Sequence, residues 1–116
     1  MDEISVDVVT WDEFAKVELR VGTVVRTEAF PKARKPAYKI WVDFGGLGVK
    51  QTSAQVTAVY GAEELVGRQV LGVVNLPPKR IAGFESQFLL TGFAGEDGGV
   101  VLAQPERSVP NGSKLF

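Results

Sequence analysis

Hydrophobic and polar residues alternate through much of the first half of the chain, a pattern typical of β-strands that bury one face. The alternation runs through residues 17–27 and returns in residues 38–44. The pair Gly45-Gly46 then supplies the positive φ angles of a tight hairpin, so residues 47–53 are expected to return as a third strand. The sequence therefore predicts three consecutive antiparallel strands.

The remaining pattern predicts short helices and more strands. Residues 10–13 have the form of a capping box, which predicts a short helix over about residues 10–16. The period changes after Ser53, which favours a second helix over residues 54–60 that ends at Gly61. Further strands are predicted over residues 70–76, a continuous apolar run typical of a strand buried on both faces, and over residues 88–93 and 100–104.

This order of elements is the layout of an OB barrel. We predict an all-β, five-to-six-stranded OB-fold with short helices, although the strand count alone also fits an SH3-like barrel or a small sandwich. Residues 1–116 are expected to form one domain, with the barrel over residues 17–104 and a tail over residues 105–116. Gly22 is expected to mark a bulge or a close approach. Barrels of this type bind extended polymers on the face of their second and third strands.

Composition narrows the classes of function. Of the 116 residues, 45% are hydrophobic and 23% are charged, as in an ordinary folded domain. The chain has no cysteine and no histidine, which excludes disulfides, thiolate metal sites and a Ser-His-Asp triad. The carboxylate pairs at residues 63–64 and 96–97 fall beside glycines in predicted surface turns, where solvation keeps their chemistry ordinary. We therefore expect no catalytic residues, no metal and no cofactor, and predict that the protein is not an enzyme.

The N-terminal segment does not read as a targeting signal. Residues 1–10 mix acids with apolar side chains and have neither the basic start nor the long apolar run of a signal peptide. Nowhere does the sequence reach the roughly 20 consecutive apolar residues that a membrane span needs. The absence of cysteine also fits a reducing compartment. We therefore expect a soluble, cytoplasmic protein without membrane insertion.

Charge is distributed unevenly, although the formal net charge is only -1. Residues 1–13 hold five acids and no base, whereas residues 14–60 hold eight bases and three acids, a local balance of +5. A basic face is one interpretation, and an ordinary solvated surface of mixed charge is the other. Trp41 alternates with Lys39 and Asp43, so its side chain is expected to point outward, where tryptophan is more often an interface residue.

Several segments carry a resemblance to a known family, and a run across residues 75–84 is the most specific of them. The segments are LRVGTV (19–24), FPKAR (30–34), VDFG (42–45), KQTSAQ (50–55), NLPPKRIAGF (75–84) and VPNGSK (109–114). In these residues the chain resembles the CsaA group, within the wider tRNA-binding OB-domain family. That resemblance implies an OB-fold homodimer that acts as a cytoplasmic chaperone linked to protein export. It further implies binding of unfolded or precursor polypeptides and association with the SecA translocation motor.

The wider family implies a second function, tRNA binding. Two departures from its usual pattern make the site more apolar: Phe30 precedes Pro31 where His-Pro is typical, and Ala54 follows Ser53 where Ser-Gly is typical. These departures favour a surface for apolar peptide. The candidate peptide-binding residues are Phe30, Trp41 and Phe84. The candidate nucleic-acid-binding residues are Lys32, Arg34, Lys50, Ser53, Lys79, Arg80 and Ser86.

Overall fold

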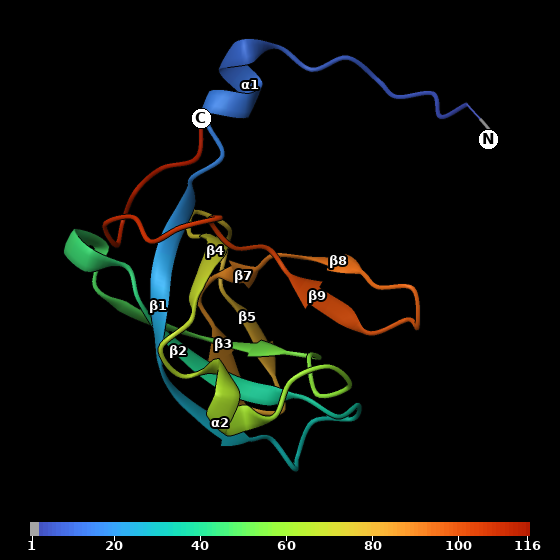
Figure 1. Ribbon diagram of the computed structural model, residues 1–116, viewed down its shortest axis with the longest axis vertical. Coiled ribbons are helices and arrows are strands. Elements are labelled where there is room, and N and C mark those ends of the chain that lie inside the picture. Colours follow the sequence, from blue (N-terminus) through green and yellow to red (C-terminus); the bar gives the residue numbers. More distant parts are fainter. Residues whose placement is uncertain (1–2) are drawn as a thin grey trace.

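The strands roll into a nearly closed barrel (Figure 1), in a computed structural model that describes residues 3–116. Five strands form one antiparallel sheet in the order β3-β2-β1-β4-β7. Their bounds are β1 Leu19–Ala29, β2 Tyr38–Asp43, β3 Val49–Ala54, β4 Gln69–Val73 and β7 Leu89–Leu90. The predicted all-β, OB-type barrel is confirmed.

Short helices and two small hairpins complete the described chain. The helices are α1 Trp11–Ala15, the 3₁₀ helix η1 Gly45–Leu47 and α2 Ala62–Leu65. One hairpin pairs β5 Lys79–Ile81 with β6 Phe84–Ser86, and the other pairs β8 Gly92–Ala94 with β9 Val100–Leu102. The predicted capping box of α1 is confirmed, because Glu13 N donates to Thr10 Oγ1 at 3.0 Å and Thr10 N donates to Glu13 Oε1 at 2.9 Å.

Several local predictions are wrong. Residues 54–60 are not helical, and the helix comes after Gly61 instead of before it. Gly61 N donates to Glu64 Oε1 at 2.6 Å, so this glycine stands at the start of a helix rather than at its end. The pair Gly45-Gly46 opens a 3₁₀ turn instead of a two-residue hairpin loop. The expected strand over residues 88–93 is divided into β7 and β8, and the hairpin of β5 and β6 lies where the sequence pattern predicts no strand.

The core is apolar and lies inside the barrel. Its largest fully buried side chains include Phe44, Ile40 and Leu65. Gly22 in β1 makes room for this core, since a Cβ there would lie 2.8 Å from both Phe44 Cδ1 and the carbonyl oxygen of Asp43. The predicted close approach at Gly22 is thus confirmed, while the irregularity in β1 lies further along, between Val24 and Arg26.

Side chains close the barrel at the outer edge of β3. Gln87 N donates to the carbonyl of Gln51 at 2.8 Å, and Gln51 N donates to Gln87 Oε1 at 3.0 Å. Two residues along β3, Ser53 N donates to Ser86 Oγ at 3.2 Å. The edge of β3 is therefore bonded by the end of β6 and the residue after it, partly through side chains.

The C-terminal segment returns to β1 and ties down the end of α1. Leu115 N donates to the carbonyl of Leu19 at 2.9 Å, and Lys114 forms an isolated bridge with Arg20. Lys114 Nζ also donates to the carbonyl of Ala15 and to Glu18 Oε2, both at 2.9 Å. Figure 1 accordingly shows the C-terminus beside the base of α1.

Candidate functional site

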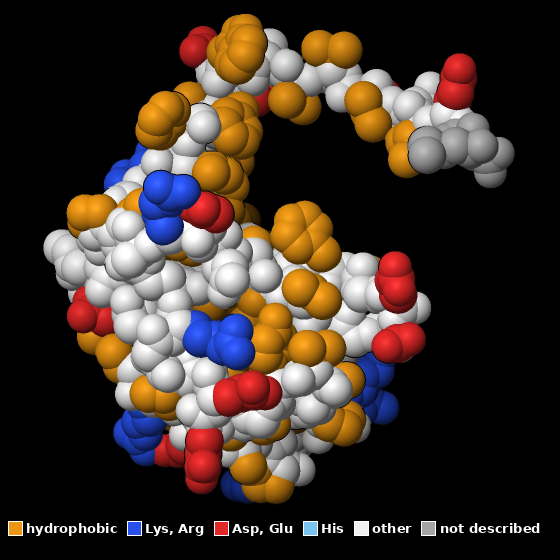
Figure 2. All heavy atoms as spheres, viewed as in Figure 1, with side chains coloured by type: hydrophobic (Ala, Val, Ile, Leu, Met, Phe, Trp, Pro, Cys, Tyr) orange, Lys and Arg blue, Asp and Glu red, His pale blue; other side chains and the backbone are white. Residues whose placement is uncertain are grey.

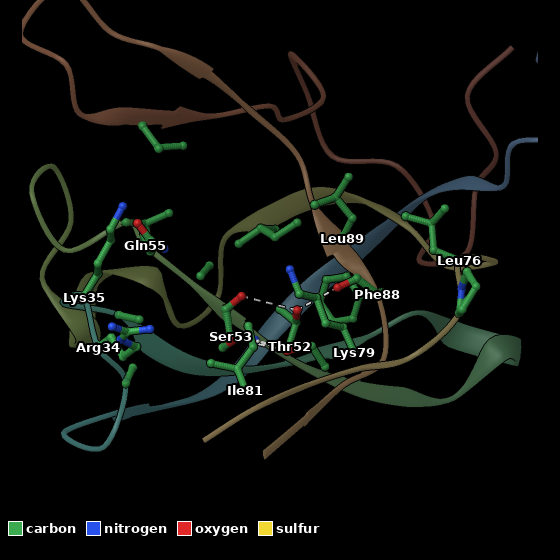
Figure 3. A pocket seen from close by; sticks show the side chains of 18 residues that line it. Arg34, Lys35, Thr52, Ser53, Gln55, Leu76, Lys79, Ile81, Phe88 and Leu89 are labelled. Atoms are coloured by element: carbon green, nitrogen blue, oxygen red, sulfur yellow. Dashed lines mark hydrogen bonds between the residues drawn. The ribbon is translucent and has the colours of Figure 1, made fainter. Parts of the chain in front are cut away.

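A pocket of about 800 Å³ opens between the loop of residues 33–37, β3, β5 and the start of β7 (Figure 3). Its apolar wall comes from elements far apart in the sequence. The wall includes Val56, Leu76, Ile81, Phe88, Leu89 and Leu90. Leu89 remains 51% exposed and Leu76 47% exposed, so these two side chains of the wall are available to a ligand.

Hydroxyl groups form one part of the polar lining of the pocket. Ser53 Oγ and Ser86 Oγ lie 3.0 Å apart, and either can donate to the other. Thr52 is buried, with its hydroxyl donating to the carbonyl of Phe88 at 2.6 Å, an interaction drawn in Figure 3. The serine hydroxyls keep further hydrogen-bonding capacity, because each oxygen has two acceptor lone pairs as well as one proton.

Basic side chains stand at the rim. Arg34 and Lys35 reach it from the loop before β2, and Lys79 reaches it from β5 (Figure 3). None of the described residues that line the pocket is acidic. The pocket therefore combines apolar walls with a positive rim, and it favours a ligand with an apolar body and a negative group. Residues 3–116 bring no three His, Cys, Asp or Glu side chains together as a metal site.

An aromatic cluster lies next to this pocket on the outer face of β2. Phe84 packs edge-on against Phe30, with ring centroids 5.6 Å apart, and against Trp41 at 6.0 Å. The ammonium of Lys39 lies 5.0 Å from the Phe30 centroid, and the guanidinium of Arg26 lies 4.5 Å from that of Trp41. These cations are held over the rings by the ring quadrupoles.

The three candidate peptide-binding aromatics are thus brought together, but not as expected. Phe30 is only 4% exposed, so its ring offers little surface to a peptide. Its ring is covered by Phe84 and Lys39. Trp41 does lie on the outer face, but it is half-buried. None of these three aromatics lines the pocket itself.

The candidate nucleic-acid-binding residues divide into two sets. Four of them meet at the pocket: Arg34, Ser53, Lys79 and Ser86. The other three do not line it: Lys32, Lys50 and Arg80. Arg80 is exposed beside Glu85, with 3.8 Å between nitrogen and oxygen, and it also donates to the carbonyl of Gly83.

Sequence reasoning misses the apolar wall. It does not single out Ile81, because it does not predict the hairpin of β5 and β6. The available signal is the spacing of Lys79 and Ile81, which puts both on one face of a strand. Leu89 is expected within a longer strand, and only the tertiary fold shows that its side chain is at the pocket.

Comparison with known proteins connects this architecture to a family. The family model described as a putative tRNA binding domain matches residues 19–114. A crystal structure of the chaperone CsaA from Bacillus anthracis has a TM-score of 0.89 and 47% identity, over 95% of this chain and 100% of that one. The chain belongs to the CsaA group of the tRNA-binding domain family.

Another solved structure and curated proteins are also similar to this chain. The CsaA chaperone protein from Picrophilus torridus has a TM-score of 0.87 and 40% identity, over 94% of this chain and 100% of that one. Methionine--tRNA ligase of Methanococcus maripaludis is 38% identical over 110 residues, which are 94% of this chain and 16% of the ligase. This CsaA-group chain therefore spans about one sixth of the length of the curated relatives that it matches. Within residues 3–116, no helix has the length and hydropathy to cross a membrane.

Proposed function

We propose that this protein is a cytoplasmic chaperone that binds unfolded or precursor polypeptides in the pocket beside β5, and that it is not an enzyme. The observation that carries the proposal is the apolar wall, in which Leu76 and Leu89 are about half exposed, in a chain that matches the CsaA chaperone from Bacillus anthracis over 95% of its length. Such a wall accepts apolar side chains of many shapes without demanding one sequence. The basic rim favours segments that also carry carboxylates.

Suppression of aggregation tests this proposal. We expect the protein to slow the aggregation of luciferase diluted from guanidinium chloride, measured by light scattering. Leu89→Asp places a charge on the wall and should abolish the effect, because binding would bury an unpaired carboxylate. Leu47→Asp is the matched control, since Leu47 is similarly exposed but does not line the pocket. Equal aggregation with and without the protein would remove the chaperone proposal.

We propose tRNA binding as the second candidate function. The family match over residues 19–114 supports it, together with the meeting of Arg34 and Lys79 at one rim. Phosphate contacts make affinity fall with salt, with a slope of roughly -0.7 to -0.9 per neutralised phosphate on a log-log plot. Filter binding of tRNA should therefore weaken with salt, and Lys79→Glu should weaken it further. Arg107→Glu, on an exposed arginine outside the pocket, is the control. Filter retention of tRNA that changes neither with salt nor with Lys79→Glu would exclude this function.

We also propose that the protein is a homodimer. Around α1 and the C-terminus, the exposed apolar side chains include Trp11 at 90%, Phe14 at 42%, Leu115 at 43% and Phe116 at 106%. A second copy would cover them, as expected for a symmetric interface. Light scattering at micromolar concentration should give twice the chain mass. Phe14→Asp should lower that mass, whereas an unchanged monomer mass for the parent protein would contradict the proposal.

The link to protein export is a further part of the proposal and rests on the resemblance to the CsaA group. We expect purified SecA to be retained by the immobilised protein. Retention that is equal on a column of an unrelated small OB domain would count against a specific interaction. RNase treatment of the sample separates direct retention from bridging by RNA.

A further inference from the structure

The N-terminal segment of residues 3–10, here called the arm, has the sequence pattern of a strand but pairs with no strand among the described residues. Its apolar residues Ile4, Val6 and Val8 are 86%, 80% and 95% exposed. They alternate with Glu3, Ser5 and Asp7. Figure 1 shows the arm extending away from the barrel, and Figure 2 shows apolar side chains following it. The alternation gives an extended arm one apolar face and one polar, acidic face.

The edge of β5 offers a place for such a strand. Among the described residues, β5 pairs with β6 on one side and with no strand on the other. Lys79 and Ile81 line the pocket, while Arg80, between them, alternates to the opposite face of β5. An unpaired edge of this kind presents backbone donors and acceptors to an added strand.

The two patterns are complementary. A strand added along β5 would place its apolar residues on the same face as Ile81, over the wall of the pocket. Its acidic residues would then face the side of Arg80, whose side chain is 69% exposed and whose guanidinium lies 3.8 Å from the Glu85 carboxylate. We propose that the arm adds as a third strand to the free edge of β5 in its own chain and covers the mouth of the pocket. The site is thus one for an extended polypeptide in which apolar and acidic residues alternate.

The root of the arm lies within reach of β5. Asn75 Nδ2 donates to the carbonyl of Lys16 at 2.7 Å, and Glu18 N donates to Asn75 Oδ1 at 2.9 Å. Asn75 precedes Lys79 by four residues, a span of at most about 14 Å. Residues 4–8 would pair with β5, so residues 9–10 and α1 must bridge this distance, and together they span up to roughly 15 Å. The arm can therefore reach β5 in its own chain if α1 turns toward that strand.

Amide exchange tests the docking without any client. The amides of Lys79 and Ile81 point toward β6, because Ile81 flanks the two-residue loop of the hairpin, so the amide of Arg80 faces the free edge. In the full chain, the Arg80 amide should exchange roughly tenfold more slowly than in a variant lacking residues 3–9, because a ladder hydrogen bond protects it. A full-length control with Ile4, Val6 and Val8 changed to serine should behave as the deletion does. Equal exchange in the parent and the deletion variant would overturn the proposal. Protection that grows with protein concentration would also overturn it, since the arm would then dock on another copy.

A synthetic peptide of residues 3–10 tests the strand geometry. It should bind the deletion variant saturably, measured by fluorescence anisotropy, and Arg80→Glu should weaken it. Neighbouring amides in a strand point to opposite edges, so either Ser5→Pro or Val6→Pro must remove a ladder donor. We expect one of these two peptides to bind roughly tenfold more weakly than the other. Equal binding by both proline peptides and the parent peptide would exclude strand addition.

The consequence for clients rests on the proposed chaperone function, and the two ideas fail separately. Deletion of residues 3–9 should raise the affinity for an unfolded polypeptide, because the arm no longer competes for the pocket. If the arm protects β5 but neither the parent protein nor the deletion variant binds an unfolded polypeptide, the proposed function is overturned and the docking stands. Client binding that is the same with and without the arm, with no protection of β5, would overturn the docking and leave the function.

Discussion

The hydroxyl oxygens of Ser53 and Ser86 lie 3.0 Å apart, although the two residues are separated by 33 positions in the sequence. Ser86 Oγ also accepts from the backbone amide of Ser53 at 3.2 Å. One serine therefore does two things: it bonds the edge of β3, and it provides part of the polar surface of the pocket. Ser53 and Ser86 are both candidate nucleic-acid-binding residues from distant segments. Their contact with each other stabilises the fold, apart from any role in binding.

Ser86→Ala tests the contribution of this contact to stability. It removes both interactions with Ser53, so we expect a loss of about 1 kcal/mol in the free energy of unfolding and a decrease of about 4 °C in Tm. The cost stays modest because both serines are half-buried and water can replace part of the bond. Thermal denaturation followed by circular dichroism measures it. Ser108→Ala, at an exposed serine of the C-terminal segment, should change Tm little, and an equal loss in both variants would contradict the assignment.

Leu89→Ala tests the apolar wall without adding a charge. Leu89 is about half exposed and lines the pocket, so its truncation should cost little stability but reduce affinity for an apolar peptide about fivefold, equivalent to about 1 kcal/mol of lost burial. Fluorescence anisotropy of a labelled peptide gives the affinity. Leu47→Ala, at a leucine of similar exposure outside the pocket, should bind as the parent protein does. A similar loss of peptide affinity in both variants would indicate that the peptide does not bind in the pocket.

Glu18 makes stability depend on pH. Hydrogen bonds from Lys114, and next from Arg20, lower the pKa of the Glu18 carboxyl in the folded state below its usual value of 4.5. A lowered folded pKa contributes stability that is present above pH 4.5 and is lost as the pH falls through the folded value. The Tm difference between the parent protein and Glu18→Gln should therefore be largest near neutral pH and shrink in acid.

The control for this pH dependence is Glu96→Gln, at an exposed carboxylate in the turn before β9. Its Tm should follow that of the parent protein across the same range. Added salt should reduce the effect of Glu18→Gln, since the groups involved are partly exposed and are screened. A Tm difference for Glu18→Gln that is constant from neutral to acid pH would show that the ion pairs do not contribute.

Gly22→Ala tests the close approach in the first strand. The new Cβ would lie 2.8 Å from the carbonyl oxygen of Asp43, a backbone atom that cannot move aside cheaply. We expect a loss of about 2 to 3 kcal/mol in the free energy of unfolding, measured by urea denaturation. Gly46→Ala is the matched control, because a Cβ added there would meet no atom within 4 Å and the φ of Gly46 is not positive. Equal effects would mean that the crowding at Gly22 is relieved by movement of β2.

Local patterns predicted the strands with long alternation and the first helix. The alternation in β1 and β2 and the capping box at Thr10 each depend on residues close in sequence, so they are visible without the fold. The hairpin of β5 and β6 has only three residues in each strand, too few for a clear period. The helix expected before Gly61 failed for a different reason, because Glu64 caps the amide of Gly61 from the other side. Gly61 marks the boundary of an element, but its contact with Glu64 shows that this element is the helix that follows.

By itself, the sequence determined the class of the fold, the exclusion of thiol and imidazole chemistry, and the basic and small polar residues that belong to the family pattern. Only the tertiary structure decided which of those residues meet. Arg34, Ser53, Lys79 and Ser86 converge on one pocket, Phe30 is buried beneath Phe84, and the free edge of β5 lies beside the pocket wall. The physical reason is that alternation specifies which face of a strand is buried, whereas convergence depends on how strands distant in the chain are wrapped around the core.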